Sequence, residues 1–148
     1  GSHETEVTAR HEVKLENYCK ILFIEAQTML EMTRRDILPA MSRFAAELSS
    51  AITARKAVMG DSDLTYEKET LRTLSALMGS TYSCVKELEQ DLLKARTIRE
   101  AAEQAEMVKT VIVSDMSRLR LAVDQMEVIG EGKQWPYPTY GEILYGIR

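Results

Sequence analysis

The chain has 148 residues, 45% of them hydrophobic and 28% charged, with a formal net charge of −4. This length and composition fit one globular domain with a sizeable core. The acidic balance argues against nucleic acid or an anionic membrane as a partner. The longest run of strong hydrophobes is only Ile21 to Ile24, far short of the ~20 residues that span a bilayer. With 7 glycines and 3 prolines, the composition favours long helices over a turn-rich β fold.

The first residues and the cysteines indicate the setting of the protein. Gly1-Ser2-His3 looks like the remnant of a purification tag, and no signal peptide is visible. Cys19 and Cys84 lie inside helical patterns without the spacing of a metal site. We therefore expect reduced thiols and a cytoplasmic protein.

The first predicted helix covers about residues 4–58. Its apolar positions fall mostly three or four apart, which places them on one face: Leu22, Met29, Met32, Leu38, Met41, Phe44, Leu48 and Ile52. Pro39 lacks an amide hydrogen and clashes with the preceding turn, so it should kink or restart this helix. Asp36 could cap such a restart.

A loop at residues 60–63 separates this helix from a second one, predicted at 64–96. The second helix has a heptad seam that alternates steps of three and four: Leu71, Leu74, Met78, Thr81, Val85, Leu88, Leu92 and Ala95. Such a seam predicts packing in an antiparallel helical bundle.

A third helix is predicted at about 99–129. Thr97 and Glu100 have the spacing of a capping box, which places the preceding turn near residues 96–99. The inward positions of this helix are Ala105, Val108, Ile112, Met116, Leu119, Val123 and Met126. The predicted fold is thus all-α, an antiparallel bundle of three long helices over residues 4–132. The N-terminal turns of the longest helix, the first, should project beyond the bundle.

Residues 133–148 form a Trp/Pro/Tyr-rich tail. Two prolines make its first half extended, and the candidate docking residues are Trp135, Pro136, Pro138 and Tyr140. Such an aromatic segment needs a surface to lie on. It either packs along its own bundle or docks on a neighbouring domain or subunit.

No catalytic, cofactor-binding or metal-ligating set can be assembled from the sequence. His11 lacks the partners of a carboxylate or zinc site, and Gly130, Gly132 and Lys133 do not complete a phosphate-binding loop because position 127 is Glu127. Acidic residues on helices mostly form solvated faces. Glu25 is the exception, since its apolar neighbours predict a half-buried carboxylate with a partner.

Three segments in chain order carry a family resemblance. Asn17-Tyr18, Ile24 to Met29 and Asp36 to Ala40 resemble the start of the C-terminal helical region of type III glutamine synthetases, the large bacterial form of that enzyme. Val111 to Glu127 resembles the penultimate helix of that family, with Ser114 at a position where the family has proline. Trp135 to Leu144 is similar to its terminal WPxPTYxxLL signature.

The resemblance implies a parent enzyme of nitrogen metabolism that condenses glutamate with ammonia, using ATP and Mg²⁺ or Mn²⁺. The catalytic barrel, its metal ligands and its nucleotide site would lie upstream, so no catalytic residue is carried onto this chain. The implied role is structural. The domain would contact the catalytic domain of the same chain and neighbouring subunits of a homo-oligomer, with no activity of its own. The alternative is a free-standing helical adaptor or regulatory interaction domain.

Overall fold

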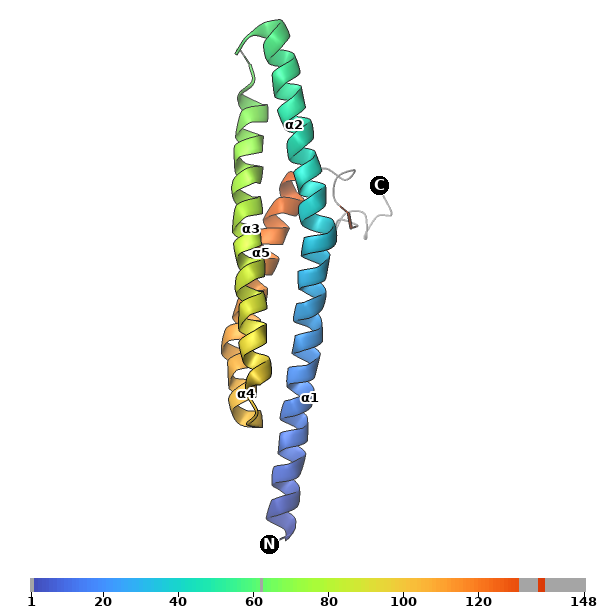
Figure 1. Ribbon diagram of the computed structural model, residues 1–148, viewed down its shortest axis with the longest axis vertical. Helices are drawn as coiled ribbons and strands as arrows, with labels where there is room; N and C mark the ends of the chain where they lie inside the picture. The colour runs from blue at the N-terminus through green and yellow to red at the C-terminus, as the bar shows by residue number, and fades with distance from the viewer. Residues whose placement is uncertain (1, 62, 131–135, 138–148) are drawn as a thin grey trace. The chain divides into compact units, whose positions relative to one another are not determined.

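The computed structural model describes residues 2–61, 63–130 and 136–137, and every regular element in these ranges is helical (Figure 1). The elements are α1 (Ser2–Met32), η1 (Thr33–Ile37), α2 (Leu38–Met59), α3 (Thr65–Thr97), α4 (Ala101–Met107), η2 (Val108–Ile112) and α5 (Val113–Ile129). The prediction of an all-helical protein is confirmed. None of the described helices is both long enough and apolar enough to cross a membrane.

Pro39 follows a turn of π-helix. In η1 the backbone widens, and the amide of Leu38 bonds to the carbonyl of Thr33, five residues earlier. Pro39 then lies in the first turn of α2, where its missing N–H costs least. The predicted cap at Asp36 is wrong. The N-cap of α2 is Ile37, which makes no side-chain cap bond, and Asp36 is part of the π turn.

The loop after α2 requires a backbone that L-residues rarely adopt. Gly60 has a φ of +70° and donates its amide to Lys56 O at 2.9 Å, which ends the helix. Asp61 then lies between two lysines, with Nζ of Lys56 at 3.4 Å and Nζ of Lys68 at 3.5 Å. These two cations lower the pKa of the Asp61 carboxyl.

The turn between α3 and α4 has a different cap from the one predicted. Glu100, not Thr97, is the N-cap, and its carboxylate accepts from the amides of Ala102 at 3.2 Å and Glu103 at 2.7 Å. Thr97 is the last residue of α3, and its hydroxyl donates back to Lys94 O at 2.7 Å. A carboxylate here also complements the helix dipole, so Glu100 can take the whole capping role.

The chain divides into two compact units. One contains Gly1–Glu31 and Cys84–Leu119, and the other contains Met32–Ser83 and Arg120–Arg148. Helices α3 and α5 therefore contribute segments to both units. Each unit has its own buried core.

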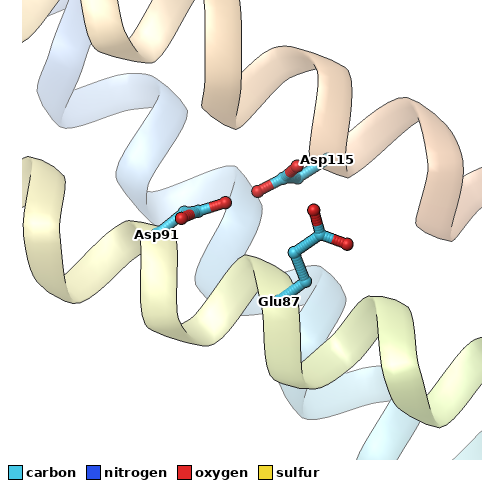
Figure 2. Close-up of side chains that lie close together, drawn as sticks. All are labelled: Glu87, Asp91 and Asp115. Carbon is cyan, nitrogen blue, oxygen red and sulfur yellow. The ribbon is translucent and has the colours of Figure 1, made fainter.

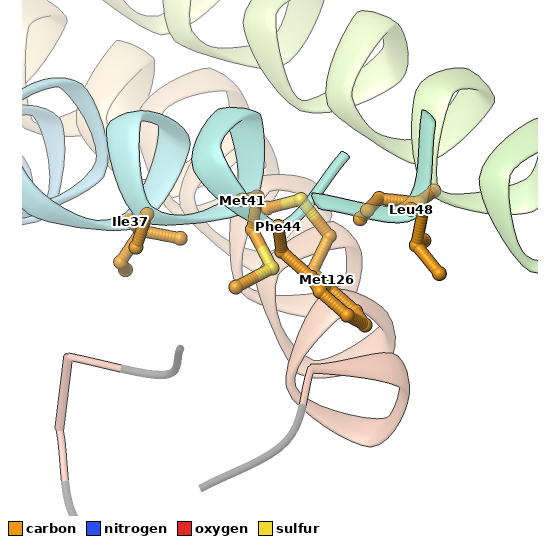
Figure 3. Close-up of a cluster of buried hydrophobic side chains, with 7 residues drawn as sticks. Ile37, Met41, Phe44, Leu48 and Met126 are labelled. Carbon is orange, nitrogen blue, oxygen red and sulfur yellow. The ribbon is translucent and has the colours of Figure 1, made fainter. Parts of the chain in front are cut away.

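In the unit of residues 32–83 and 120–148, the core lies between α2, α3 and α5 (Figure 3). Its buried members are Ile37, Ala40, Met41, Phe44, Leu48, Leu74 and Met126. Gly130, just after α5, lies close against this core. A Cβ there would lie 3.1 Å from the Met41 Cε atom, so a larger residue at this position would require the end of the Met41 side chain to shift.

In the unit of residues 1–31 and 84–119, buried side chains come from α1, α3 and the α4–α5 segment. They are Cys19, Ala26, Leu30, Val85, Leu88, Leu92, Ala95, Ala105, Val108, Ile112, Asp115, Met116 and Leu119. Arg96 of α3 also stacks over the Phe23 ring of α1, 5.6 Å from its centroid. Residues 3–14 of α1 are exposed, and Figure 1 shows these turns continuing past the α3–α4 turn.

The seam of the first helical region differs in part from the predicted one. The buried positions include the small or polar residues Cys19, Ala26, Thr33 and Ala40. The predicted seam was built from large apolar side chains and therefore did not include them. Leu22 and Met29 lie beside this seam and are half-buried, whereas Met32 is exposed. The predicted seam of α3 is correct, since all eight of its positions are buried or half-buried.

The tail is described only at Pro136 and Tyr137; Trp135, Pro138 and Tyr140 lie outside the described residues. Pro136 is exposed, and Tyr137 packs against the Phe44 core cluster. The Tyr137 hydroxyl donates to Asp36 Oδ2 at 2.5 Å. Burial and this bond raise the pKa of Tyr137 to about 12. At this residue the chain packs on its own helices.

Truncation of a buried leucine in the α3 seam should destabilise the fold. Leu74 is fully buried in the cluster around Phe44, and Leu74→Ala should lower the free energy of unfolding by about 2–4 kcal/mol because a cavity is left. Leu93→Ala is the matched control on the same helix, since Leu93 is 61% exposed. Urea denaturation followed by circular dichroism measures both. Equal losses in the two variants would contradict this assignment of the core.

The contact of Tyr137 with Asp36 should contribute measurable stability. Tyr137→Phe keeps the ring and removes the hydrogen bond, so the free energy of unfolding should fall by about 0.5–1.5 kcal/mol. Tyr66→Phe, at a side chain that is 72% exposed, should change it by less. The same denaturation experiment decides, and a Tyr137 variant as stable as the parent chain would argue against the contact.

Candidate functional site: a buried carboxylate cluster

The structure does not bring the residues singled out in the sequence into one site. Glu25 is exposed on α1, so the prediction of a half-buried carboxylate is wrong. The reason is its register, because it lies beside the buried seam position Ala26 and points away from the core. Pro39 is half-buried in the first turn of α2. His11 lines a shallow pocket with Tyr18 and Lys109, and its side chain is exposed.

Three other carboxylates come together instead. Glu87 and Asp91 are one turn apart on α3, and Asp115 projects toward them from α5 (Figure 2). One oxygen from each carboxylate lies within 4.8 Å of the others. All three residues belong to the unit of residues 1–31 and 84–119. Like charges this close repel strongly unless a proton or a cation separates them.

Arg118 partly neutralises the cluster. Its Nη2 atom donates to Glu87 Oε1 at 3.1 Å and to Asp115 Oδ1, and its Nη1 atom lies 3.1 Å from Ser114 Oγ. The Arg118 side chain is 49% exposed, so this cation reaches the cluster from its solvent side. One positive charge faces three carboxylates.

Asp115 is the most buried member. Its side chain is 2% exposed, and its second oxygen, Oδ2, is buried without a hydrogen-bond partner among the described residues. The pKa of Asp115 is raised to about 7, and the largest cause is burial. A hydrogen bond to Asp91 and the negative charges of Asp91 and Glu87 also raise this pKa, whereas the positive charge of Arg118 lowers it. In its protonated form the Asp115 hydroxyl can donate to Asp91. Near neutral pH the cluster therefore exchanges a proton.

Cys84 lies one turn before Glu87 and is half-buried. Burial and the negative charge of Glu87 raise the pKa of its thiol, although Arg118 acts the other way. This thiol is therefore protonated at neutral pH and is a poor nucleophile. Both cysteines are free, as predicted, and Cys19 is buried.

A second buried carboxylate, Glu67, has a different arrangement. It pairs with Arg55 through Oε1, while its Oε2 atom is buried and without a hydrogen-bond partner among the described residues. No second acidic side chain is grouped with it in the described part of the chain. We interpret it as an ion pair that holds α2 to the first turn of α3.

The heptad pattern of residues 108–126 contains a signal for the carboxylate cluster. Positions 108, 112, 115, 119, 122 and 126 alternate steps of four and three, and all six are buried. Five of them carry apolar residues, and the sixth is Asp115. An aspartate at a core position of a heptad predicts a buried carboxyl that needs a partner. Its partners come from α3, and the pairing of the two helices depends on the tertiary structure.

Comparison with known proteins identifies the relatives of the chain. Residues 2–56 match the family described as the glutamine synthetase C-terminal domain. A glutamine synthetase of Butyrivibrio fibrisolvens is 32% identical over 143 residues, which are 97% of this chain and 20% of that protein. A glutamine synthetase of Bacteroides fragilis (strain YCH46) is 22% identical over 97% of this chain and 20% of that protein.

A type-3 glutamine synthetase of Dictyostelium discoideum is 23% identical over 95% of this chain and 20% of that protein. The chain thus spans about one fifth of the length of these relatives. The family resemblance predicted from the three motifs is confirmed.

The raised pKa of Asp115 predicts how stability depends on pH. Because the folded-state pKa of about 7 lies above the ordinary value of 3.8, the folded state holds the proton more tightly between these values. The contribution of Asp115 to stability is therefore full at low pH, falls as pH rises, and is lost above about pH 7. In Asp115→Asn the amide replaces the protonated carboxyl at all pH values. This variant should gain about 1–3 kcal/mol relative to the parent chain between pH 5 and pH 8.

Urea denaturation at both pH values, with EDTA present, measures this change. Asp124→Asn is the matched control, because Asp124 is exposed on the same helix. An equal difference between Asp115→Asn and the parent chain at pH 5 and pH 8 would contradict the assigned protonation.

Proposed function

Because the chain is a C-terminal domain of the glutamine synthetase family, we propose that it is the non-catalytic helical domain of a type III enzyme and helps to assemble its subunits. In this proposal the rest of the enzyme joins glutamate and ammonia at the expense of ATP, with Mg²⁺ or Mn²⁺, in the cytoplasm of a bacterium. The domain itself would contact the catalytic domain and neighbouring subunits.

The observation that carries the proposal is the extent of the matches. They cover 95–97% of this chain but 20% of each relative. The relatives therefore have four fifths of their length outside the matched region, which leaves room there for a catalytic core. The type-3 name of one relative and the WPxPTYxxLL-like tail support the assignment to type III.

The surface of α1 supports a role in contacts. Val13, Ile21 and Ile24 are 54%, 55% and 67% exposed and lie apart from the buried seam. Several large apolar side chains exposed on one helix are typical of a surface that contacts another protein. The proposal assigns this surface to the catalytic domain, which would join the chain ahead of α1.

The arrangement of the helices is part of the same proposal. We expect the three long helical regions to run antiparallel as one bundle, with a bend at Pro39. The buried heptad seam of α3 and the π turn before Pro39 support this arrangement. The tail would contact both its own helices, as Tyr137 does, and a neighbouring subunit through Trp135.

Removal of the tryptophan should test the role in assembly. In the full-length enzyme, Trp135→Ala should shift the protein toward smaller oligomers in size-exclusion chromatography with light scattering, because a large aromatic anchor is lost. Tyr66→Phe is a suitable control at an exposed position outside the tail. An unchanged oligomer would contradict a docking role for the tail.

Two measurements test this function, and the first of them separates it from the adaptor alternative. The gene upstream of Glu4 should continue into a synthetase core, whereas a start codon there would favour a free-standing adaptor. The isolated chain should show no micromolar ATP binding in calorimetry with Mg²⁺. Such binding would show that the domain is not purely structural.

A further inference from the structure

We propose that Glu87, Asp91 and Asp115 form a binding site for a hard divalent cation of calcium size between α3 and α5. This inference does not depend on the proposed role in assembly. It rests on the spacing of the carboxylates, on an unpartnered buried oxygen and on the balance of charge.

The spacing of the oxygens fits the larger divalent cations. The three carboxylate oxygens lie within 4.8 Å of one another. Ca²⁺ binds carboxylate oxygens at about 2.3–2.6 Å, so two ligands on opposite sides of the ion are separated by up to about 5 Å. Mg²⁺ requires about 2.0–2.1 Å and a strict octahedron, which side chains fixed on two helices meet less readily than the flexible coordination of Ca²⁺. The site should therefore prefer Ca²⁺ to Mg²⁺.

The second observation is independent of the clustering of acidic residues. Asp115 Oδ2 is buried without a hydrogen-bond partner among the described residues, on a side chain that is 2% exposed, and Figure 2 shows this carboxylate directed at Asp91 and Glu87. A buried carboxylate oxygen without a donor is unfavourable by several kcal/mol. A proton or a cation at this position removes that penalty.

The balance of charge also favours a divalent ion. Three ionised carboxylates and Arg118 sum to −2, which one divalent cation neutralises. Arg118 already occupies Glu87 Oε1 and Asp115 Oδ1, so the entering cation competes with this guanidinium. We therefore expect weak binding, with a Kd of about 0.1–1 mM.

Titration calorimetry of the chain with CaCl₂ tests the site directly. The heat should fit one site per chain with a Kd of about 0.1–1 mM. MgCl₂ should bind at least about threefold more weakly. Ca²⁺ should also raise the melting temperature of the parent chain more than that of Asp115→Asn, because a cation that binds the folded state stabilises it.

Variants of the cluster give opposite and specific outcomes. Asp115→Asn should lower Ca²⁺ affinity about tenfold or more, while the exposed Asp124→Asn on the same helix should leave it unchanged. Arg118→Met removes the competing cation and should tighten Ca²⁺ binding at least about threefold. If Arg118 only stabilises the fold through its ion pairs, Arg118→Met should be less stable than the parent chain and should bind Ca²⁺ no more tightly.

The proposal is overturned if Ca²⁺ produces no heat at 5 mM, or if Asp115→Asn and the parent chain bind it equally, which would indicate diffuse attraction to an acidic surface. It is also overturned if Arg118→Met binds no more tightly than the parent chain. If circular dichroism shows that Asp115→Asn is unfolded, Asp91→Asn replaces it, with the same expected loss of affinity.

Discussion

The apolar seam of α3 is the constraint on which the rest of the structure depends. This one helix contributes Leu74 and Thr81 to one unit, and Val85, Leu88 and Leu92 to the other, and all five are buried. Burial of a leucine side chain stabilises a fold by roughly 1.5–3 kcal/mol. In each unit, the other helices must therefore present complementary apolar faces to the α3 seam.

The α5 seam presents such an apolar face, but one of its buried positions carries an ionisable group. Asp115 occupies a core position between Ile112 and Leu119, so the packing that stabilises the fold also buries a carboxyl next to two others. Arg118 offsets part of the repulsion, and a proton near neutral pH offsets more. Replacement by an apolar residue would often be as stable. The Asp115 carboxyl therefore adds little stability by itself, and its unpartnered oxygen is the group that the proposed cation would bind.

A structural domain and a cation site are compatible in one protein. Helix α1 buries one seam and leaves Ile21 and Ile24 exposed, which is compatible with the proposed contacts to other parts of the enzyme. A cation held between α3 and α5 would strengthen the contact of these two helices and make their stability depend on pH and divalent ions.

The sequence by itself determined the helical class, the seam of α3, the free cysteines and the family, because periodicity and short motifs are local properties of the chain. It misplaced the cap before α4, where Glu100 acts, because several polar residues near the turn could serve. It also misjudged Glu25, because the seam of α1 uses small residues. Only the tertiary structure decided that Asp115 meets Glu87 and Asp91, since which faces of two helices meet depends on how the whole chain packs.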